Sequence, residues 1–86
     1  MKNVPFLLEA FAEVLKNQRE MRNFTQRELA ERMESARSLI SFLENAKNMP
    51  SLQTFFAIAD VLQISPREFL DEVVMTMERM RSSRQP

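Results

Sequence analysis

Apolar residues recur along this chain at steps of three and four, and no stretch alternates for long between apolar and polar residues. Steps of three and four are the period of an α-helix, whereas alternation would indicate a strand. Turn and cap residues divide the pattern into five segments with short connections. The pattern therefore predicts an all-α fold, a compact five-helix bundle in one domain.

Two of the segments open with the spacing of a capping box, in which two side chains each accept the backbone N–H of the other residue. Thr25 and Glu28 form one such pair. Ser65 and Glu68 form a second, with Pro66 at the first helical position. We expect the second and fifth helices to begin there.

The other helices are bounded by prolines and small polar residues. Asn3 is expected to cap a first helix over about residues 5–22. The third helix is expected to start at Ser35 or Ala36 and to end at Asn45. The fourth helix, capped by Ser51, is expected to turn the following residues inward: Leu52, Phe55, Phe56, Ala59 and Leu62.

The domain is expected to span residues 1–80, with a helix-turn-helix at about 25–45 and a C-terminal helix at about 66–80. Residues 81–86 are expected to form a flexible tail. In a helix-turn-helix, the first helix holds the second against the major groove of DNA, and base edges meet the first turns of that second helix.

The third helix would present two different faces. Ile40 and Leu43 lie three residues apart and are expected to face the core together with Ala36. The opposite face carries Arg37, Ser38, Ser41 and Phe42. Arginine pairs with guanine through two hydrogen bonds, serine contacts bases or phosphates, and phenylalanine contacts the thymine methyl group. This face is chemically suited to reading DNA.

Composition excludes several classes of protein. The chain has no Cys and no His, which removes disulfides, thiolate metal sites and the commonest acid–base side chain. We therefore expect no enzyme, no metal and no cofactor. Glu9 and Glu13 interrupt the longest apolar run, so no membrane span is expected and the location is expected to be cytoplasmic. The 12 basic and 12 acidic residues cancel, whereas a DNA-binding domain usually carries a basic excess.

Three segments carry a resemblance to a known family. The sequence "TQRELAERM", the sequence "RSLISFLE" and the closing "PSLQTFFAIADVLQISPREF" follow one another at a characteristic spacing. Together they resemble the Xre/Cro family of phage-repressor-type, lambda-repressor-like helix-turn-helix proteins, over about residues 11–70. The resemblance implies a sequence-specific DNA-binding transcription regulator. It also implies a homodimer on a palindromic operator, with half-sites about 34 Å apart.

The resemblance also implies roles for single residues. Gln26 would contact phosphate and brace the reading helix. Lys47 and Asn48 would lie on the DNA backbone. The expected DNA-binding residues are Gln26, Arg27, Arg37, Ser38, Ser41, Phe42, Lys47 and Asn48.

Seven positions depart from the family pattern. Ala36 stands where the family usually has serine at the start of the reading helix, which removes one phosphate contact, and Ser35 is the expected substitute cap. Glycine is common in the family where this chain has Asn23, Glu34, Ala46 and Gln63. If the left-handed conformation is kept, each of the last three costs about 1 kcal/mol.

Leu39 and Phe42 stand where polar residues are common, and three interpretations are open. The first is that Leu39 packs against the second helix and Phe42 partly covers the core edge. The second is that Phe42 contacts a thymine methyl group. The third is that the two residues form a protein-binding patch.

The last helix carries an apolar stripe longer than a small core needs. One interpretation is that the first helix, with Phe6, Leu7 and Leu8, covers the stripe within one chain. The other, which we favour, is a dimer seam between two copies. The expected dimerisation residues are Phe69, Val73, Val74, Met77 and Met80.

The sequence thus predicts a transcription regulator that binds double-stranded DNA as a homodimer through residues 25–48. A modulating protein partner would dock on its apolar surfaces. One rival is a protein-interaction module of the antitoxin or anti-repressor type that uses Leu39 and Phe42. Another is a purely structural oligomerisation domain that uses the last helix.

Overall fold

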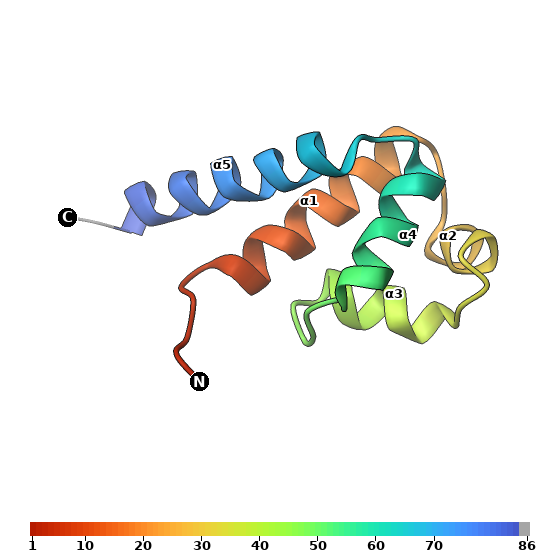
Figure 1. The fold of residues 1–86 in the computed structure, drawn as a ribbon, viewed down its shortest axis with the longest axis horizontal. Coiled ribbons are helices and arrows are strands. Elements are labelled where there is room, and N and C mark those ends of the chain that lie inside the picture. Colours follow the sequence, from red (N-terminus) through yellow and green to blue (C-terminus); the bar gives the residue numbers. More distant parts are fainter. Residues whose placement is uncertain (85–86) are drawn as a thin grey trace.

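The computed structural model describes residues 1–84, and these form five α-helices without strands. The helices are α1 (Leu7–Met21), α2 (Gln26–Arg32), α3 (Arg37–Glu44), α4 (Leu52–Leu62) and α5 (Pro66–Arg84). In Figure 1, α1 and α5 lie side by side and run in opposite directions, while α2, α3 and α4 gather at the end where α1 finishes and α5 starts. The prediction of an all-α, five-helix fold is confirmed.

The helix starts follow the predicted caps in most places. The Glu28 N–H donates to Thr25 Oγ1 at 3.0 Å and the Thr25 N–H donates to Glu28 Oε1 at 2.9 Å, so the capping box is complete. Ser51 Oγ accepts from the Thr54 N–H at 3.0 Å. The cap at Ser65 differs from the prediction, because its hydroxyl accepts from the N–H of Arg67 and not from Glu68.

The start of α1 was predicted wrongly. The helix begins at Leu7 and not at Pro5, and within residues 1–84 no side chain caps it, so Asn3 has no capping role. The chain instead turns just before the helix. Phe6 adopts a left-handed conformation with φ 69°, and the Leu7 N–H donates to Val4 O at 3.3 Å.

All five helices contribute to one hydrophobic core. Its centre is a group of aromatic rings: Phe11 of α1 stacks on Phe69 of α5 at 5.8 Å between centroids, and Phe55 of α4 lies 4.9 Å from Phe69. Each fully buried phenylalanine of this kind stabilises the fold by about 1.5–3 kcal/mol. Ile40 and Leu43 of α3 belong to the same core, as the sequence predicted.

Three residues that were predicted to face inward lie on the surface: Leu52, Phe56 and Ala36. Apolar residues occupy more of the circumference of α4 than its neighbours cover. Ile58, Ala59 and Leu62 take the covered side, which leaves Leu52 and Phe56, one turn apart, on the open side. Ala36 precedes the first turn of α3 and is exposed.

The last helix is longer than predicted. It continues through Arg84, four residues past the expected end at Met80, so residues 81–84 are not the flexible tail that we expected. Residues 85–86, the rest of that expected tail, lie outside the described residues. None of the helices within residues 1–84 combines the length and the apolar character needed to cross a bilayer.

Each of the first four helices is followed, within two residues of its end, by a residue with left-handed backbone. The φ values are 58° at Asn23, 55° at Glu34, 56° at Ala46 and 57° at Gln63. These are the positions where the resembling family commonly has glycine, so the chain keeps the turn geometry without the residue that adopts it most easily. For Glu34, Ala46 and Gln63 the cost is about 1 kcal/mol each.

Candidate nucleic-acid interface

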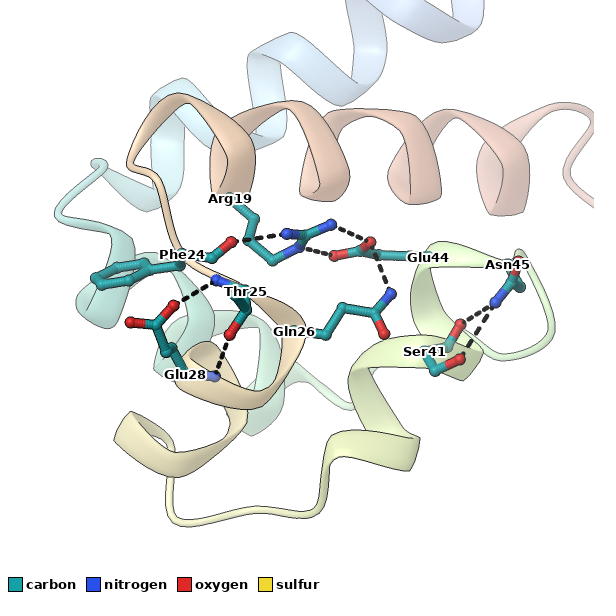
Figure 2. Close-up of polar contacts among 8 residues, drawn as sticks. All are labelled: Arg19, Phe24, Thr25, Gln26, Glu28, Ser41, Glu44 and Asn45. Atoms are coloured by element: carbon teal, nitrogen blue, oxygen red, sulfur yellow. Dashed lines mark hydrogen bonds and ion pairs between the residues drawn. The ribbon is translucent and has the colours of Figure 1, made fainter.

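A buried ion pair joins α1 to the end of α3. Arg19 Nε donates to Glu44 Oε2 at 2.6 Å, Arg19 Nη2 donates to Glu44 Oε1 at 2.9 Å, and Arg19 Nη1 donates to Phe24 O at 2.7 Å (Figure 2). The two side chains are only 10% and 3% exposed. The hydrogen bond to Glu44 raises the pKa of Arg19 against the opposing effect of burial, so the guanidinium group stays charged.

The ion pair also reaches α2. Gln26, the first residue of α2, donates from Nε2 to Glu44 Oε1 at 3.1 Å (Figure 2). Glu44 is the last residue of α3, so one carboxylate connects three helices and fixes how α3 is held against α2. Gln26 thus contacts α3 directly, as expected for a residue that braces the reading helix.

The outward face of α3 is accessible. Arg37 and Ser38 are exposed, Ser41 is half-buried, and the Phe42 side chain is 50% exposed. Ile40 and Leu43 are fully buried on the opposite side, which fixes the rotation of the helix. Nothing in the described chain covers the face that the sequence assigned to DNA.

The two contested apolar residues of α3 are placed differently. Leu39 is half-buried and packs against the core, which matches the first interpretation for this residue. Phe42 lies outside the core cluster with half of its surface free, so it does not serve as a core residue. Contact with DNA and contact with a protein remain the two interpretations for Phe42.

The first turn of α3 is open to an anion. Its N-cap is Ala36, which has no side-chain acceptor, and its first turn contains no acidic residue. Ser35 does not replace the missing cap; its own N–H donates to Ala30 O at 2.9 Å. The first N–H groups of α3 and the positive end of its dipole therefore lie beside exposed Arg37, an arrangement that favours phosphate.

The loop after α3 stays close to the same helix. The Lys47 N–H donates to Phe42 O at 2.9 Å, across the left-handed turn at Ala46. Lys47 and Asn48 are exposed on this loop, and Arg27 is exposed on the first turn of α2. All eight expected DNA-binding residues thus lie on α2, α3 or the loop that follows them.

Three polar residues of this region were not identified from the sequence. Asn45 donates from Nδ2 to the Ser41 carbonyl at 2.8 Å and to Ser41 Oγ at 3.3 Å, next to the outward face (Figure 2). Arg19 and Glu44 were missed because they are far apart in sequence, and nothing in a helical period marks a charged residue as buried. The only available signal for Glu44 was its place in the "RSLISFLE" segment.

The expected dimer seam on α5 needs correction. Phe69 is 0% exposed and Val73 is buried beside it in the core of the single chain. Met77 and Met80 are partly buried against the same core, and only Val74 is exposed. The reason is that α1 covers most of the stripe, so Phe69 and Val73 cannot meet a second copy.

Within residues 1–84, no three acidic side chains gather as ligands for a metal ion.

The sequence matches the helix-turn-helix family over residues 15–69. The chain therefore belongs to the helix-turn-helix family, of the Xre type, as the resemblance indicated. Members are DNA-binding transcription regulators and not enzymes, in agreement with the expectation from the sequence. No match was found among curated proteins.

Solved structures with a similar fold include regulators of transcription. The clp gene regulator ClgR of Corynebacterium glutamicum aligns with a TM-score of 0.86 and 26% identity, over 92% of this chain and 84% of that one. The restriction-modification controller protein C.AhdI of Aeromonas hydrophila aligns with a TM-score of 0.69 and 29% identity, over 72% and 94%. The controller protein C.Esp1396I aligns with a TM-score of 0.76 and 25% identity, over 85% and 94%.

Proposed function

We propose that this protein regulates transcription by binding a palindromic operator as a homodimer. The observation that carries the proposal is the accessible face of α3, held in place by the buried contacts among Arg19, Glu44 and Gln26. A reading helix must present polar side chains outward and must not rotate, because base recognition depends on side-chain placement. Both conditions are met here.

Each residue of the face has a chemical role in this proposal. Arg37 pairs with guanine through N7 and O6, and Ser38 and Ser41 contact bases or nearby phosphates. Phe42 contacts a thymine methyl group. The remaining residues contact the DNA backbone: Gln26, Arg27, Lys47 and Asn48.

The relatives support the same reading. C.Esp1396I has been solved as a tetramer in complex with its natural 35-base-pair operator, and ClgR is a regulator of clp genes. A two-fold dimer presents two copies of α3 at a spacing of about one helical turn, roughly 34 Å, which matches a palindrome. A protein that binds an operator must reach DNA inside the cell, which fits the cytoplasmic location expected from the sequence.

Binding to genomic DNA fragments, titrated with salt, tests the proposal. A protein that neutralises phosphates releases counterions, so affinity should fall steeply as salt rises. Arg37→Ala should relax sequence preference and cost about 1–3 kcal/mol in binding free energy. Arg81→Ala, an exposed arginine on α5, is the matched control and should leave the preference unchanged. If no fragment is retained even at low salt, the proposal is wrong.

A second candidate function rests on Phe42. Its half-exposed ring and the neutral net charge of the chain also suit a protein-interaction module of the antitoxin or anti-repressor type. In that case no DNA fragment binds, and Phe42→Ala abolishes a protein complex while Arg37→Ala leaves it intact.

A further inference from the structure

Asn45, at the end of α3, lies on the same face as the two serines of that helix. It follows Ser38 by seven residues and Ser41 by four, the spacings that place side chains on one side of a helix. Its Nδ2 donates to the Ser41 carbonyl at 2.8 Å and to Ser41 Oγ at 3.3 Å (Figure 2). Asn45 is exposed and Ser41 is half-buried, so the two side chains form one connected pair on the outward face.

The partners of the Asn45 amide determine its orientation. A backbone carbonyl accepts hydrogen bonds and cannot donate one, so the end of the amide that faces the Ser41 carbonyl must be the NH2 group. The other end, Oδ1, has no hydrogen-bond partner within residues 1–84. Asn45 therefore offers an acceptor to a molecule that approaches this face.

The same contact determines what the Ser41 hydroxyl can do. A serine hydroxyl carries one proton and two lone pairs. Here Oγ accepts from Asn45 Nδ2 and donates to no group of the described residues. The proton cannot point at the NH2 group of Asn45, because that group does not accept. Ser41 therefore offers a donor next to the acceptor of Asn45.

A donor beside an acceptor is the complement of the adenine edge. In the major groove, adenine presents an acceptor, N7, next to a donor, the N6 amino group. Guanine presents two acceptors, N7 and O6, so Asn45 Oδ1 would face O6 with no proton between them. Cytosine presents only the donor, thymine only the acceptor, and a phosphate only acceptors. Adenine is thus the base that satisfies both groups of the pair.

Buried contacts hold the pair in place. Asn45 directly follows Glu44, whose carboxylate accepts hydrogen bonds from Arg19 of α1 and Gln26 of α2. The backbone N–H of Asn45 also donates to the Ser41 carbonyl, at 3.0 Å, so the last turn of α3 is closed at this residue. Hydrogen-bonding groups discriminate between bases only when their own positions are fixed. The end of α3 meets this condition.

We propose that Ser41 and Asn45 together read one adenine in each half-site. Ser41 Oγ donates to N7, and the N6 amino group donates to Asn45 Oδ1. This inference rests on the proposed function, since it names the base that one part of the same face recognises. It adds Asn45 to the residues that contact DNA, and it gives Ser41 a base as its partner in place of a phosphate.

Operator duplexes with altered adenines test the two contacts separately. In 7-deazaadenine a carbon replaces N7, which removes the acceptor, and in purine the N6 amino group is missing, which removes the donor. Each adenine of one half-site is replaced in turn in an operator that the wild type binds, and the dissociation constant is measured. At one adenine the wild type should lose about 10-fold in affinity with either analogue, as expected for the loss of one base contact.

Two alanine variants should each remove one of these sensitivities. With Ser41→Ala, 7-deazaadenine should bind as well as adenine at that position, while purine should stay about 10-fold weaker. The reason is that Asn45 Nδ2 also donates to the backbone carbonyl of residue 41, which the substitution keeps. With Asn45→Ala, purine should bind as well as adenine. Neither residue belongs to the core, so circular dichroism should show folded protein for both variants.

Asn45→Asp reverses the polarity of the pair and keeps the size of the side chain. A carboxylate only accepts, so the Ser41 proton turns toward it and away from the base, and 7-deazaadenine should then bind as well as adenine. Asn48→Asp, an exposed position in the following loop with the same change of charge, is the matched control. It should weaken binding to all duplexes by one common factor and keep the 10-fold differences, because its charge acts on the phosphates.

The possible outcomes separate this inference from the proposed function. If no adenine shows both sensitivities, or if both alanine variants keep the wild-type pattern, the pair does not read adenine. If Ser41→Ala instead abolishes sensitivity to a single neutral methylphosphonate, Ser41 contacts a phosphate and the inference is wrong. A wild type that binds DNA without such an adenine overturns the inference alone, whereas a wild type that binds no DNA overturns the proposed function as well.

Discussion

The end of the molecule formed by α2 and α3 and the side formed by α4 and α5 are held together by different kinds of contact. At the α2–α3 end, Glu44 of α3 forms a buried ion pair with Arg19 of α1 and accepts a hydrogen bond from Gln26 of α2. These two contacts fix α3 relative to α1 and α2. Between α4 and α5, by contrast, the ring of Phe55 lies 4.9 Å from that of Phe69, and the two helices line an apolar groove that is left open. Directional polar contacts give the placement that reading needs, while apolar contacts give association without strict direction.

Among the substitutions that test this comparison, removal of Glu44 should change the free energy of unfolding most. Glu44→Ala leaves Arg19 charged and nearly buried without its partner, so the free energy of unfolding should fall by about 3–5 kcal/mol. Urea denaturation measures the loss.

The matched control is the ion pair between Arg79 and Glu13, whose side chains are solvent-accessible. Arg79→Ala should cost less than about 1 kcal/mol, because water screens an exposed pair. Equal losses for Glu44→Ala and Arg79→Ala would mean that the buried pair does not hold α3.

The left-handed turn between α3 and α4 offers a substitution that should increase the free energy of unfolding. Ala46 has φ 56°, so Ala46→Gly should raise the free energy of unfolding by about 1 kcal/mol by relieving the clash of its Cβ. Ala57→Gly, in the interior of α4, should instead lower it by about 0.5–1 kcal/mol. Thermal unfolding of the two variants should therefore shift to opposite sides of the wild type. If both variants shifted in the same direction, the backbone of Ala46 would not be strained.

The role of Phe42 can be tested on the DNA itself. Once an operator has been selected, replacing single thymines by deoxyuridine removes one methyl group, worth about 0.8 kcal/mol if it is buried against a side chain. At one position the wild type should lose about four-fold in affinity. Phe42→Ala should show no difference between thymine and deoxyuridine there. If no thymine position distinguishes the two proteins, Phe42 does not read a methyl group.

The smallest expected effect is on stability at acidic pH, through Glu28 of the capping box. Hydrogen bonds from Thr25, first from its backbone and then from its side chain, lower the pKa of Glu28 from its ordinary value of 4.5. Since the folded value lies below the unfolded one, the stabilisation is present above pH 4.5 and is lost as the pH falls through the folded pKa.

Glu28→Gln should therefore show a shallower loss of stability than the wild type as the pH falls below 4.5. Glu31→Gln, an exposed position on the same helix, serves as the control. If Glu28→Gln lost stability at low pH as steeply as the wild type does, the capping box would not contribute to stability in solution.

Local features of the fold were predictable from the sequence because their causes are local. The capping box at Thr25 and Glu28 and the cap at Ser51 depend on residues within one turn of each other. The direction of Ile40 and Leu43 follows from a spacing of three along one helix. The family resemblance, in turn, located the four left-handed turns, whose geometry is a property of single residues.

The tertiary structure alone decided which surfaces are covered and which charges meet. A helical period gives the directions of side chains around one axis, but not how much of that circumference the neighbouring helices cover. For this reason Phe69 and Val73, which the pattern allowed on a seam, lie inside the core, while Leu52 and Phe56 lie outside it. Arg19 and Glu44 meet only because α1 and α3 pack together, a contact between residues 25 positions apart that no spacing along one helix encodes.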